Sequence, residues 1–172
     1  EVRDSTFNNC SANFAGAICS LNSEILISYS NFTNNLARYE GGAVYKMYGS
    51  GTVIKSNFTK NAALNGGALF SDNCTSFEIK NSEFASNAAT GFGGAIFSNA
   101  NPKLTVDGVT FTDNKASYNA NMLNQSNFSP IVSSTNNYSL FVYKSLLNGT
   151  LPARYNLAEN GFVTDVKNQQ DS

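Results

Sequence analysis

Histidine and tryptophan are absent from this sequence of 172 residues, which contains only 3 prolines and 3 cysteines. Without histidine, a serine nucleophile would lack the imidazole base that usually activates it. Charged residues make up only 13% of the chain, about half the usual share, and the net charge is −1. No run of Lys or Arg occurs, so neither nucleic acid nor an anionic membrane is an expected partner.

Long apolar stretches are also missing, because no apolar run reaches the roughly 18 residues that a membrane span needs. The chain does not open on a signal peptide. Its first residues, Glu1 to Phe7, match Ile79 to Phe84 inside the sequence. We therefore expect a processed or partial chain that begins within a repeat, with any targeting segment upstream.

Amides and hydroxyls dominate the polar residues, with 26 Asn, 21 Ser and 12 Thr. A surface made polar in this way suits an extracellular protein better than a cytosolic one. The composition therefore predicts an extracellular or cell-surface location.

A repeat of about 26 residues organises the first two thirds of the chain. Its most regular member is a phenylalanine, found at Phe7, Phe32, Phe58, Phe84 and Phe111, with steps of 25, 26, 26 and 27 residues. Self-similarity at a fixed period of this length indicates a solenoid in which each repeat forms one coil.

Further columns appear when the repeats are aligned on this phenylalanine. Five residues before it stand Val2, Ile27, Val53, Ile79 and Val106. Three residues after it stand Cys10, Asn35, Asn61, Asn87 and Asn114, and the glycine column is Gly16, Gly42, Gly67 and Gly94. We expect the apolar columns to fill the interior. We expect the Asn column to turn corners, through left-handed dihedrals and an amide ladder. The Gly pairs should permit positive φ and close backbone approach.

Apolar residues alternate around each phenylalanine, and β-branched residues, Gly and Asn are frequent, which predicts short strands joined by tight turns. We therefore expect an all-β solenoid of about five coils over residues 1–123. Residues 124–172 lose the register but contain two expected strands, Leu140 to Tyr143 and Phe162 to Val166. We interpret this segment as an end cap or a strand-exchange arm.

The motif Phe-x-x-Asn followed by Gly-Gly-Ala and Ile, Leu or Val resembles the polymorphic outer-membrane protein repeat of adhesin-like surface proteins. It occurs at Phe32 to Asn35 with Gly41 to Val44, at Phe58 to Asn61 with Gly66 to Leu69, and at Phe84 to Asn87 with Gly93 to Ile96. The resemblance covers residues 1–123, and the first and last repeats depart from it. It implies a right-handed parallel β-helix, a cell-surface setting and an adhesive role.

Some β-helices are polysaccharide lyases or hydrolases, and these need a local cluster of carboxylates with basic residues. Here the carboxylates occupy different columns, so we predict no catalytic residues. Asp107 and Lys80 share a column on adjacent coils, which we interpret as a solvated pair. Asp72-Asn73 and Asp113-Asn114 offer oxygen ligands without a calcium-loop spacing, so we interpret them as turns and predict no metal and no cofactor.

Three cysteines leave one unpaired: Cys10 and Cys19 could form a disulfide, and Cys74 remains. One further column holds aromatic residues at Tyr45, Phe70 and Phe97. We expect this column to be a packed stack rather than a sugar-binding platform.

Eight N-glycosylation sequons occur, a count only slightly above what the Asn, Ser and Thr content gives by chance. They are Asn9, Asn31, Asn57, Asn73, Asn124, Asn127, Asn137 and Asn148. Asn31 and Asn57 directly precede an inward phenylalanine, so alternation along the strand points their side chains outward.

These features together predict a non-enzymatic, extracellular structural or adhesive protein, glycosylated on some of its sequons. Its expected partners are its own copies, joined head to tail into filaments, or an extracellular host or matrix ligand such as a glycan. The alternative is a carbohydrate-active enzyme, a lyase or hydrolase, on the same scaffold.

Overall fold

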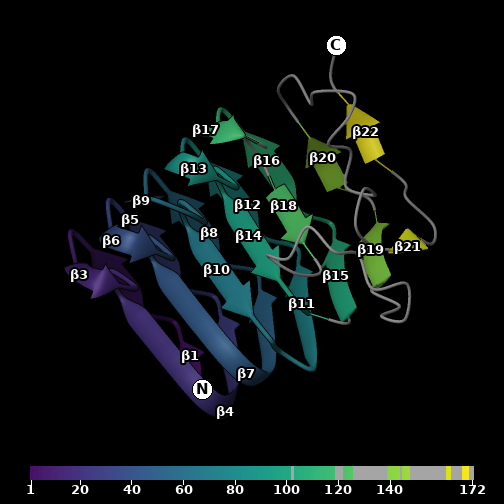
Figure 1. The fold of residues 1–172 in the computed structure, drawn as a ribbon, viewed down its shortest axis with the longest axis horizontal. Helices are drawn as coiled ribbons and strands as arrows, with labels where there is room; N and C mark the ends of the chain where they lie inside the picture. The colour runs from purple at the N-terminus through teal and green to yellow at the C-terminus, as the bar shows by residue number, and fades with distance from the viewer. Residues whose placement is uncertain are drawn as a thin grey trace.

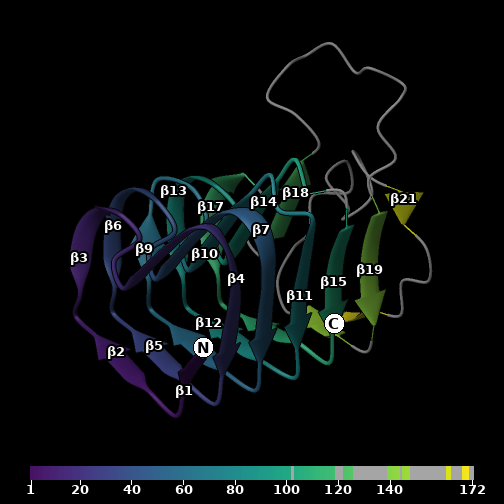
Figure 2. The same cartoon turned by 90° about the horizontal axis from the view of Figure 1, so that it is seen from below.

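The structure is a computed structural model that describes residues 1–101, 103–118, 122–125, 139–143, 145–147, 162–163 and 168–170. Within these residues every regular element is a β-strand, and the paired strands form three parallel sheets. Successive coils lie side by side along the long axis of the molecule, and each of the first five passes through all three sheets in turn (Figures 1 and 2). The parallel β-helix architecture is therefore confirmed.

We call the seven-stranded sheet that contains the phenylalanine column sheet II. Its strands, in spatial order, are β2 (Thr6–Asn8), β5 (Asn31–Thr33), β8 (Asn57–Thr59), β12 (Glu83–Ala85), β16 (Thr110–Thr112), β20 (Ser145–Leu147) and β22 (Asn168–Gln170). Phe7, Phe32, Phe58, Phe84 and Phe111 pair directly along the first five strands. The chain therefore completes about four turns between the first and the fifth phenylalanine, which confirms the period predicted from sequence.

Sheet III follows sheet II in every coil from the first to the fifth. Its strands are β3 (Ser11–Phe14), β6 (Leu36–Glu40), β9 (Ala62–Ala63), β13 (Ala88–Phe92) and β17 (Lys115–Tyr118). The register shifts once between β3 and β6 and once between β13 and β17, so this sheet is less regular than sheet II.

Sheet I completes each coil with the longest strands. They are β1 (Val2–Arg3), β4 (Ile18–Ser28), β7 (Val44–Ile54), β10 (Leu69–Asp72), β11 (Ser76–Lys80), β14 (Ile96–Asn99), β15 (Lys103–Asp107), β18 (Met122–Gln125), β19 (Ser139–Tyr143) and β21 (Phe162–Val163). In the first two coils one strand of 11 residues spans this side. In the third and fourth coils two shorter strands, separated by a bend, take the place of this long strand.

Both strands expected in the C-terminal segment are present in the residues that the structure describes, and residues 164–166 of the second one lie outside them. Strand β19 pairs in parallel with β15, and β21 pairs with β19. Strands β20 and β22 likewise extend sheet II beyond β16. These strands therefore add to the same sheets as the repeats.

A stack of phenylalanine rings forms the centre of the core. Ring centroids of successive coils lie 5.0, 4.7, 4.6 and 5.5 Å apart, with interplanar angles of 5°, 3°, 2° and 17°. From Phe32 to Phe111 these side chains are fully buried, as are Ile27, Val53, Ile79 and Val106 of the neighbouring column. Offset stacking at this spacing adds to the hydrophobic free energy of burying the rings.

The two glycines of each Gly-Gly pair have different roles. The first is left-handed, with φ of 65° at Gly41 and 61° at Gly66. The second lies so close to the next coil that a Cβ on Gly42 would stand 2.0 Å from the carbonyl oxygen of Gly67. Both roles predicted for the pair are confirmed.

Candidate functional site

An asparagine ladder lines the corner between sheets II and III. The Asn61 Nδ2 donates to the Phe32 carbonyl at 3.0 Å and to the Asn87 Oδ1 at 3.0 Å. In turn the Asn61 Oδ1 accepts from the backbone N–H and the Nδ2 of Asn35, each at 3.0 Å. Asn35, Asn61 and Asn87 are almost completely buried, so each amide satisfies backbone groups that would otherwise lack a partner.

The left-handed dihedrals expected at this column lie elsewhere, and that part of the prediction is wrong. Positive φ occurs one residue earlier, at Asn9, Asn34, Lys60, Ser86 and Asp113. The chain turns at this exposed preceding residue, which leaves the column Asn free to point its amide inward.

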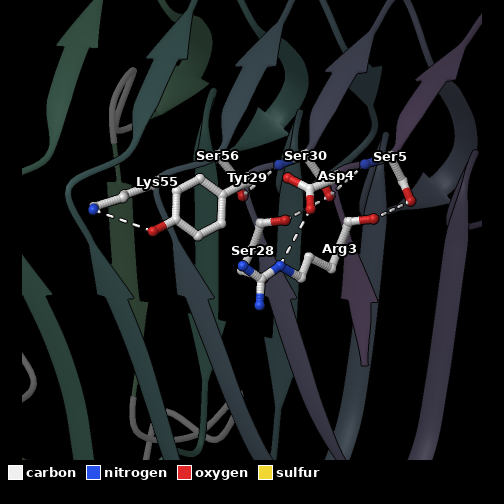
Figure 3. A network of polar contacts seen from close by, with 8 residues as sticks. All are labelled: Arg3, Asp4, Ser5, Ser28, Tyr29, Ser30, Lys55 and Ser56. Carbon is white, nitrogen blue, oxygen red and sulfur yellow. Dashed lines mark hydrogen bonds and ion pairs between the residues drawn. The ribbon is translucent and has the colours of Figure 1, made fainter.

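A serine ladder at the corner between sheets I and II was missed by the sequence reasoning. The Ser30 Oγ accepts from the Ser5 N–H and the Ser56 Oγ accepts from the Ser30 N–H, both at 3.2 Å (Figure 3). The same hydroxyl of Ser30 donates to the Ser28 carbonyl at 2.9 Å. The signal was available, because a serine stands two residues before the phenylalanine in four consecutive repeats.

Outside the serine ladder, one exposed tyrosine lies between two basic side chains. The Arg3 guanidinium carbon lies 5.4 Å and the Lys55 Nζ 5.2 Å from the Tyr29 ring centroid. Lys55 also donates to the Tyr29 hydroxyl at 3.2 Å, and Arg3 pairs with Asp4 at 3.2 Å (Figure 3). Because these groups are exposed, their pairs stabilise the corner only weakly.

The aromatic column is packed, as expected, rather than open to a ligand. Tyr45, Phe70 and Phe97 are at most 6% exposed and form a cluster separate from the phenylalanine core. The Phe14 ring lies 5.7 Å from Tyr45 and the Phe92 ring lies 6.2 Å from Phe97. Residues at the ends of sheet III strands therefore contact this column from outside.

Two carboxylates from different columns influence the titration of neighbouring groups around Tyr45. Burial raises the pKa of the Glu40 carboxyl, and the negative charge of Asp72 raises it further. Burial raises the pKa of Tyr45 strongly, and the charges of Glu40 and Asp72 add to this effect. Glu40 pairs with Asn65 and Asp72 pairs with Met47, so the two carboxylates lie in different columns, as predicted.

Asp72 has two amide partners beside it. Its Oδ1 accepts from the Asn73 Nδ2 at 2.9 Å and from the Asn99 Nδ2 at 2.7 Å. Asn99 is only 9% exposed, and its Oδ1 has no hydrogen-bond partner among the residues that the structure describes.

The side chains of Lys80 and Asp107, which the sequence predicts to form a solvated pair, are arranged differently from that expectation. Lys80 and Asp107 are register partners on adjacent strands, but the Lys80 ammonium pairs with Glu78 at 2.9 Å. In the described part of the chain, this contact and the Arg3–Asp4 pair are the only salt bridges. No group of three or more His, Cys, Asp or Glu able to hold a metal occurs among those residues.

One lysine is buried inside the solenoid and was not anticipated. Lys46 is 0% exposed, and its ammonium donates to the carbonyl oxygens of Met47 and Tyr48. Burial lowers the pKa of Lys46, because the interior disfavours its charge. The two carbonyls lie where the chain bends next to the left-handed Gly49, so Lys46 stabilises an irregular corner.

The three cysteines are free thiols, so the suggested disulfide between Cys10 and Cys19 is not formed. The two residues belong to different columns. Cys10 starts the asparagine ladder, where its N–H donates to the Asn35 Oδ1. Cys19 is exposed and begins the aromatic column. Strand β3 lies between Cys10 and Cys19 in the chain. Cys74 is buried, and burial raises its pKa to about 11.

Four of the eight sequons lie among residues 1–101, and all four are on the surface. Asn9, Asn31, Asn57 and Asn73 are exposed, with Asn9 and Asn73 in left-handed turns. The Asn57 Nδ2 donates to the Asn31 Oδ1 at 3.0 Å, so these two sequons are direct neighbours. Asn124 lies on β18, whereas Asn127, Asn137 and Asn148 lie outside the described residues.

An open groove of about 690 Å³ follows sheet III across four coils. Its lining is rich in alanine, and Arg38 is its charged residue. Leu36 and Leu64 in this lining are 52% and 42% exposed. The residues that line the groove are Ser11, Ala12, Asn13, Leu36, Ala37, Arg38, Ala62, Ala63, Leu64, Ala88, Ala89 and Thr90.

Comparisons with protein-family models, curated proteins and solved structures give no match for this chain. Among the described residues, no helix is long and apolar enough to cross a membrane.

Proposed function

We propose that this chain is a non-enzymatic, extracellular structural module that adheres to a surface ligand. The observation that carries the proposal is the open groove along sheet III, because it repeats over four coils and carries exposed apolar side chains. Exposed apolar surface that is contiguous and rimmed by polar residues is typical of an interaction site. The solenoid supplies a rigid scaffold for such an extended surface.

Glycosylation is part of the same proposal. The four sequons within residues 1–101 all present exposed asparagines, and none of these four asparagines lines the groove, although Ser11 of the Asn9 sequon does. Glycans at Asn31, Asn57 and Asn73 would therefore be attached outside the groove lining. Intact-mass measurement before and after glycosidase treatment of secreted protein tests this part, and an unchanged mass contradicts it.

Adhesion is tested by measuring binding of the full chain to immobilised extracellular-matrix glycans and proteins. Leu36→Ser and Leu64→Ser remove apolar surface from the groove and should together lower binding at least tenfold. Leu21→Ser is the matched control, because Leu21 is equally exposed, at 52%, but lies on β4 of sheet I. Equal binding by the groove variant and the control would reject the groove as the adhesive surface.

Self-association of copies of this chain is the last part of the proposal. Within the residues that the structure describes, strands β2 and β3 lie at the edges of their sheets, and β1 pairs with Ile27 and Ser28 of β4. Unpaired edge strands recruit further strands unless they are covered. Phe7 ends the ring stack at this edge, so Phe7→Lys should abolish any concentration-dependent increase in mass by light scattering. A full chain that stays monomeric at high concentration contradicts this part.

A carbohydrate-active enzyme is the second candidate, favoured by the raised pKa of Glu40, to which burial and then the charge of Asp72 contribute. A paired acid and base at a sugar site is what glycoside hydrolysis requires. Neither residue lines the groove, and this separation supports adhesion over catalysis. Release of reducing ends from polysaccharides by the full chain, abolished in Glu40→Gln, would favour the enzyme instead.

A further inference from the structure

The outer face of sheet III carries positive charge along the groove. Arg38 is the charged residue of the lining, and neither salt bridge of the described residues involves it. Lys115 is exposed and pairs in register with Ala88 of the lining, so a second cation extends the same face by one coil. The residues that line the groove include no carboxylate, and Glu40, which ends β6, lies outside them. In a chain of net charge −1, this face is therefore locally positive.

A β-bulge places Arg38 and Tyr39 together beside the groove. The register between β3 and β6 shifts after Ala12, so that two residues of β6, Arg38 and Tyr39, oppose the single residue Asn13. Strict alternation along a strand would direct one of two consecutive side chains inward, but both are exposed, Tyr39 at 37%. Bulges re-aim side chains in this way and are over-represented next to functional sites.

Tyr39 joins the Arg38 guanidinium to an exposed aromatic surface. The guanidinium carbon lies 5.3 Å from the Tyr39 ring centroid, within the range of a cation–π contact. The Phe14 ring, which is 47% exposed, lies 5.2 Å from the Tyr39 ring at an angle of 36°. The contact with Tyr39 orients the planar guanidinium, whose forked N–H donors match the oxygens of a carboxylate or sulfate. A ligand that carries an anionic group beside an apolar ring face fits this arrangement.

We propose that the groove binds an anionic polysaccharide, with Arg38 and Tyr39 as the residues that select an acidic sugar. The C–H face of a pyranose ring packs on Tyr39 and Phe14, while the carboxylate or sulfate of the sugar accepts hydrogen bonds from Arg38. Coils follow one another at about 4.8 Å, so a polymer that lies along the groove also reaches Lys115 with a later acidic sugar. This inference rests on the proposed adhesive groove and specifies the class of its ligand.

The test measures binding of the full chain to polygalacturonic acid, to the same polymer with its carboxyl groups reduced to alcohols, to dextran sulfate and to dextran. At least one anionic polymer should bind about tenfold more tightly than its neutral counterpart, because the neutral polymer lacks the charge-assisted hydrogen bonds. The two pairs distinguish a carboxylate from a sulfate as the group that Arg38 binds. The affinity should fall as sodium chloride rises from about 0.05 to 0.5 M, because salt screens exposed charges.

Arg38→Gln should weaken binding of the anionic polymer about tenfold, whereas Arg38→Lys keeps the charge without the planar fork and should weaken it about threefold. Tyr39→Ser should also weaken binding, because it removes the ring that packs on the sugar. Arg3→Gln is the matched control, since the Arg3 guanidinium carbon lies 5.4 Å from the Tyr29 ring, at the corner between sheets I and II. Both arginines are exposed, so neither change removes a core contact, and the control should bind like the unmodified chain.

Several outcomes would overturn the proposal. They are failure to bind either anionic polymer, equal binding to charged and neutral polymers, an affinity that salt leaves unchanged, and equal losses in Arg38→Gln and Arg3→Gln. Poly-glutamate that binds as tightly as the anionic polysaccharides would assign the face to acidic peptides instead. If the chain adheres to matrix proteins or neutral glycans and loses this adhesion with Leu36→Ser and Leu64→Ser, but binds no anionic polysaccharide, only the ligand class is wrong. If it binds none of these materials, the adhesive groove is wrong as well.

Discussion

Removing one amide from the middle of the asparagine ladder should destabilise the solenoid as strongly as removing a core side chain. Asn61→Ala deletes the acceptor of the Asn35 N–H and the donor to the Phe32 carbonyl, both of which are buried. The Asn35 Nδ2 keeps its bond to the Phe7 carbonyl, and the Asn87 Oδ1 still accepts from the backbone N–H of residue 61.

Two buried backbone groups are therefore left without their partner. At about 1–3 kcal/mol for each unsatisfied group, the free energy of unfolding should fall by about 2–6 kcal/mol. Urea titration followed by circular dichroism measures this loss as a lower transition midpoint with an unchanged slope.

Asn57→Ala is the matched control, because it removes an exposed amide four residues earlier that bonds only to the Asn31 side chain. Its expected loss is at most about 0.5 kcal/mol. If the two variants lose similar stability, the ladder does not carry the energy assigned to it here, and backbone pairing alone would explain the corner.

Three further predictions follow from the core, the glycine column and the buried thiol. Phe58→Ala should cost about 3–5 kcal/mol in a denaturant titration because Phe58 is 0% exposed, whereas Phe92→Ala, at 36% exposed, should cost clearly less. Gly42→Ala would place a methyl group 2.0 Å from a backbone carbonyl oxygen, so the free energy of unfolding should fall by about 1–3 kcal/mol or more in the same assay. Gly91→Ala is the control, because its methyl group would lie 2.6 Å from the Oδ1 of the movable Asn65 side chain and should lower the free energy of unfolding less. Burial raises the pKa of the Cys74 thiol from 9.0 to about 11, so between these pH values the folded chain keeps a proton that the unfolded chain has lost. The free energy of unfolding should therefore contain about 2–3 kcal/mol that is present below pH 9 and is lost as the pH rises to 11. Cys74→Ser should lack this alkaline loss in paired titrations, and an identical pH dependence in both proteins would contradict the assignment.

The repeat period was predictable because equivalent residues of a parallel solenoid stack directly on one another. A column read from the sequence is therefore also a column of contacts. On this basis the phenylalanine stack, the Gly42 close approach and the Asn61 ladder were expected, and the structure confirms them. The serine ladder is equally readable from the sequence, because Ser30 and Ser56 each stand two residues before the phenylalanine and bond to one another through the Ser30 N–H.

Contacts across the coil, by contrast, depend on where the chain bends, and only the tertiary structure decided them. Aligning the repeats predicts which residues stack along the axis of the solenoid. It does not predict which residues of different columns, on different sheets, come into contact. Glu40 and Asp72 lie in unrelated columns, yet the charge of Asp72 helps to raise the pKa of Glu40 in the folded coil. The buried Lys46 has the same cause, because a local bend exposes the carbonyls of Met47 and Tyr48 to the interior, where an ammonium can reach them. The bend itself lies at Tyr48 and Gly49, which both have positive φ, and the carbonyls that meet the Lys46 ammonium follow from this folded geometry rather than from any column.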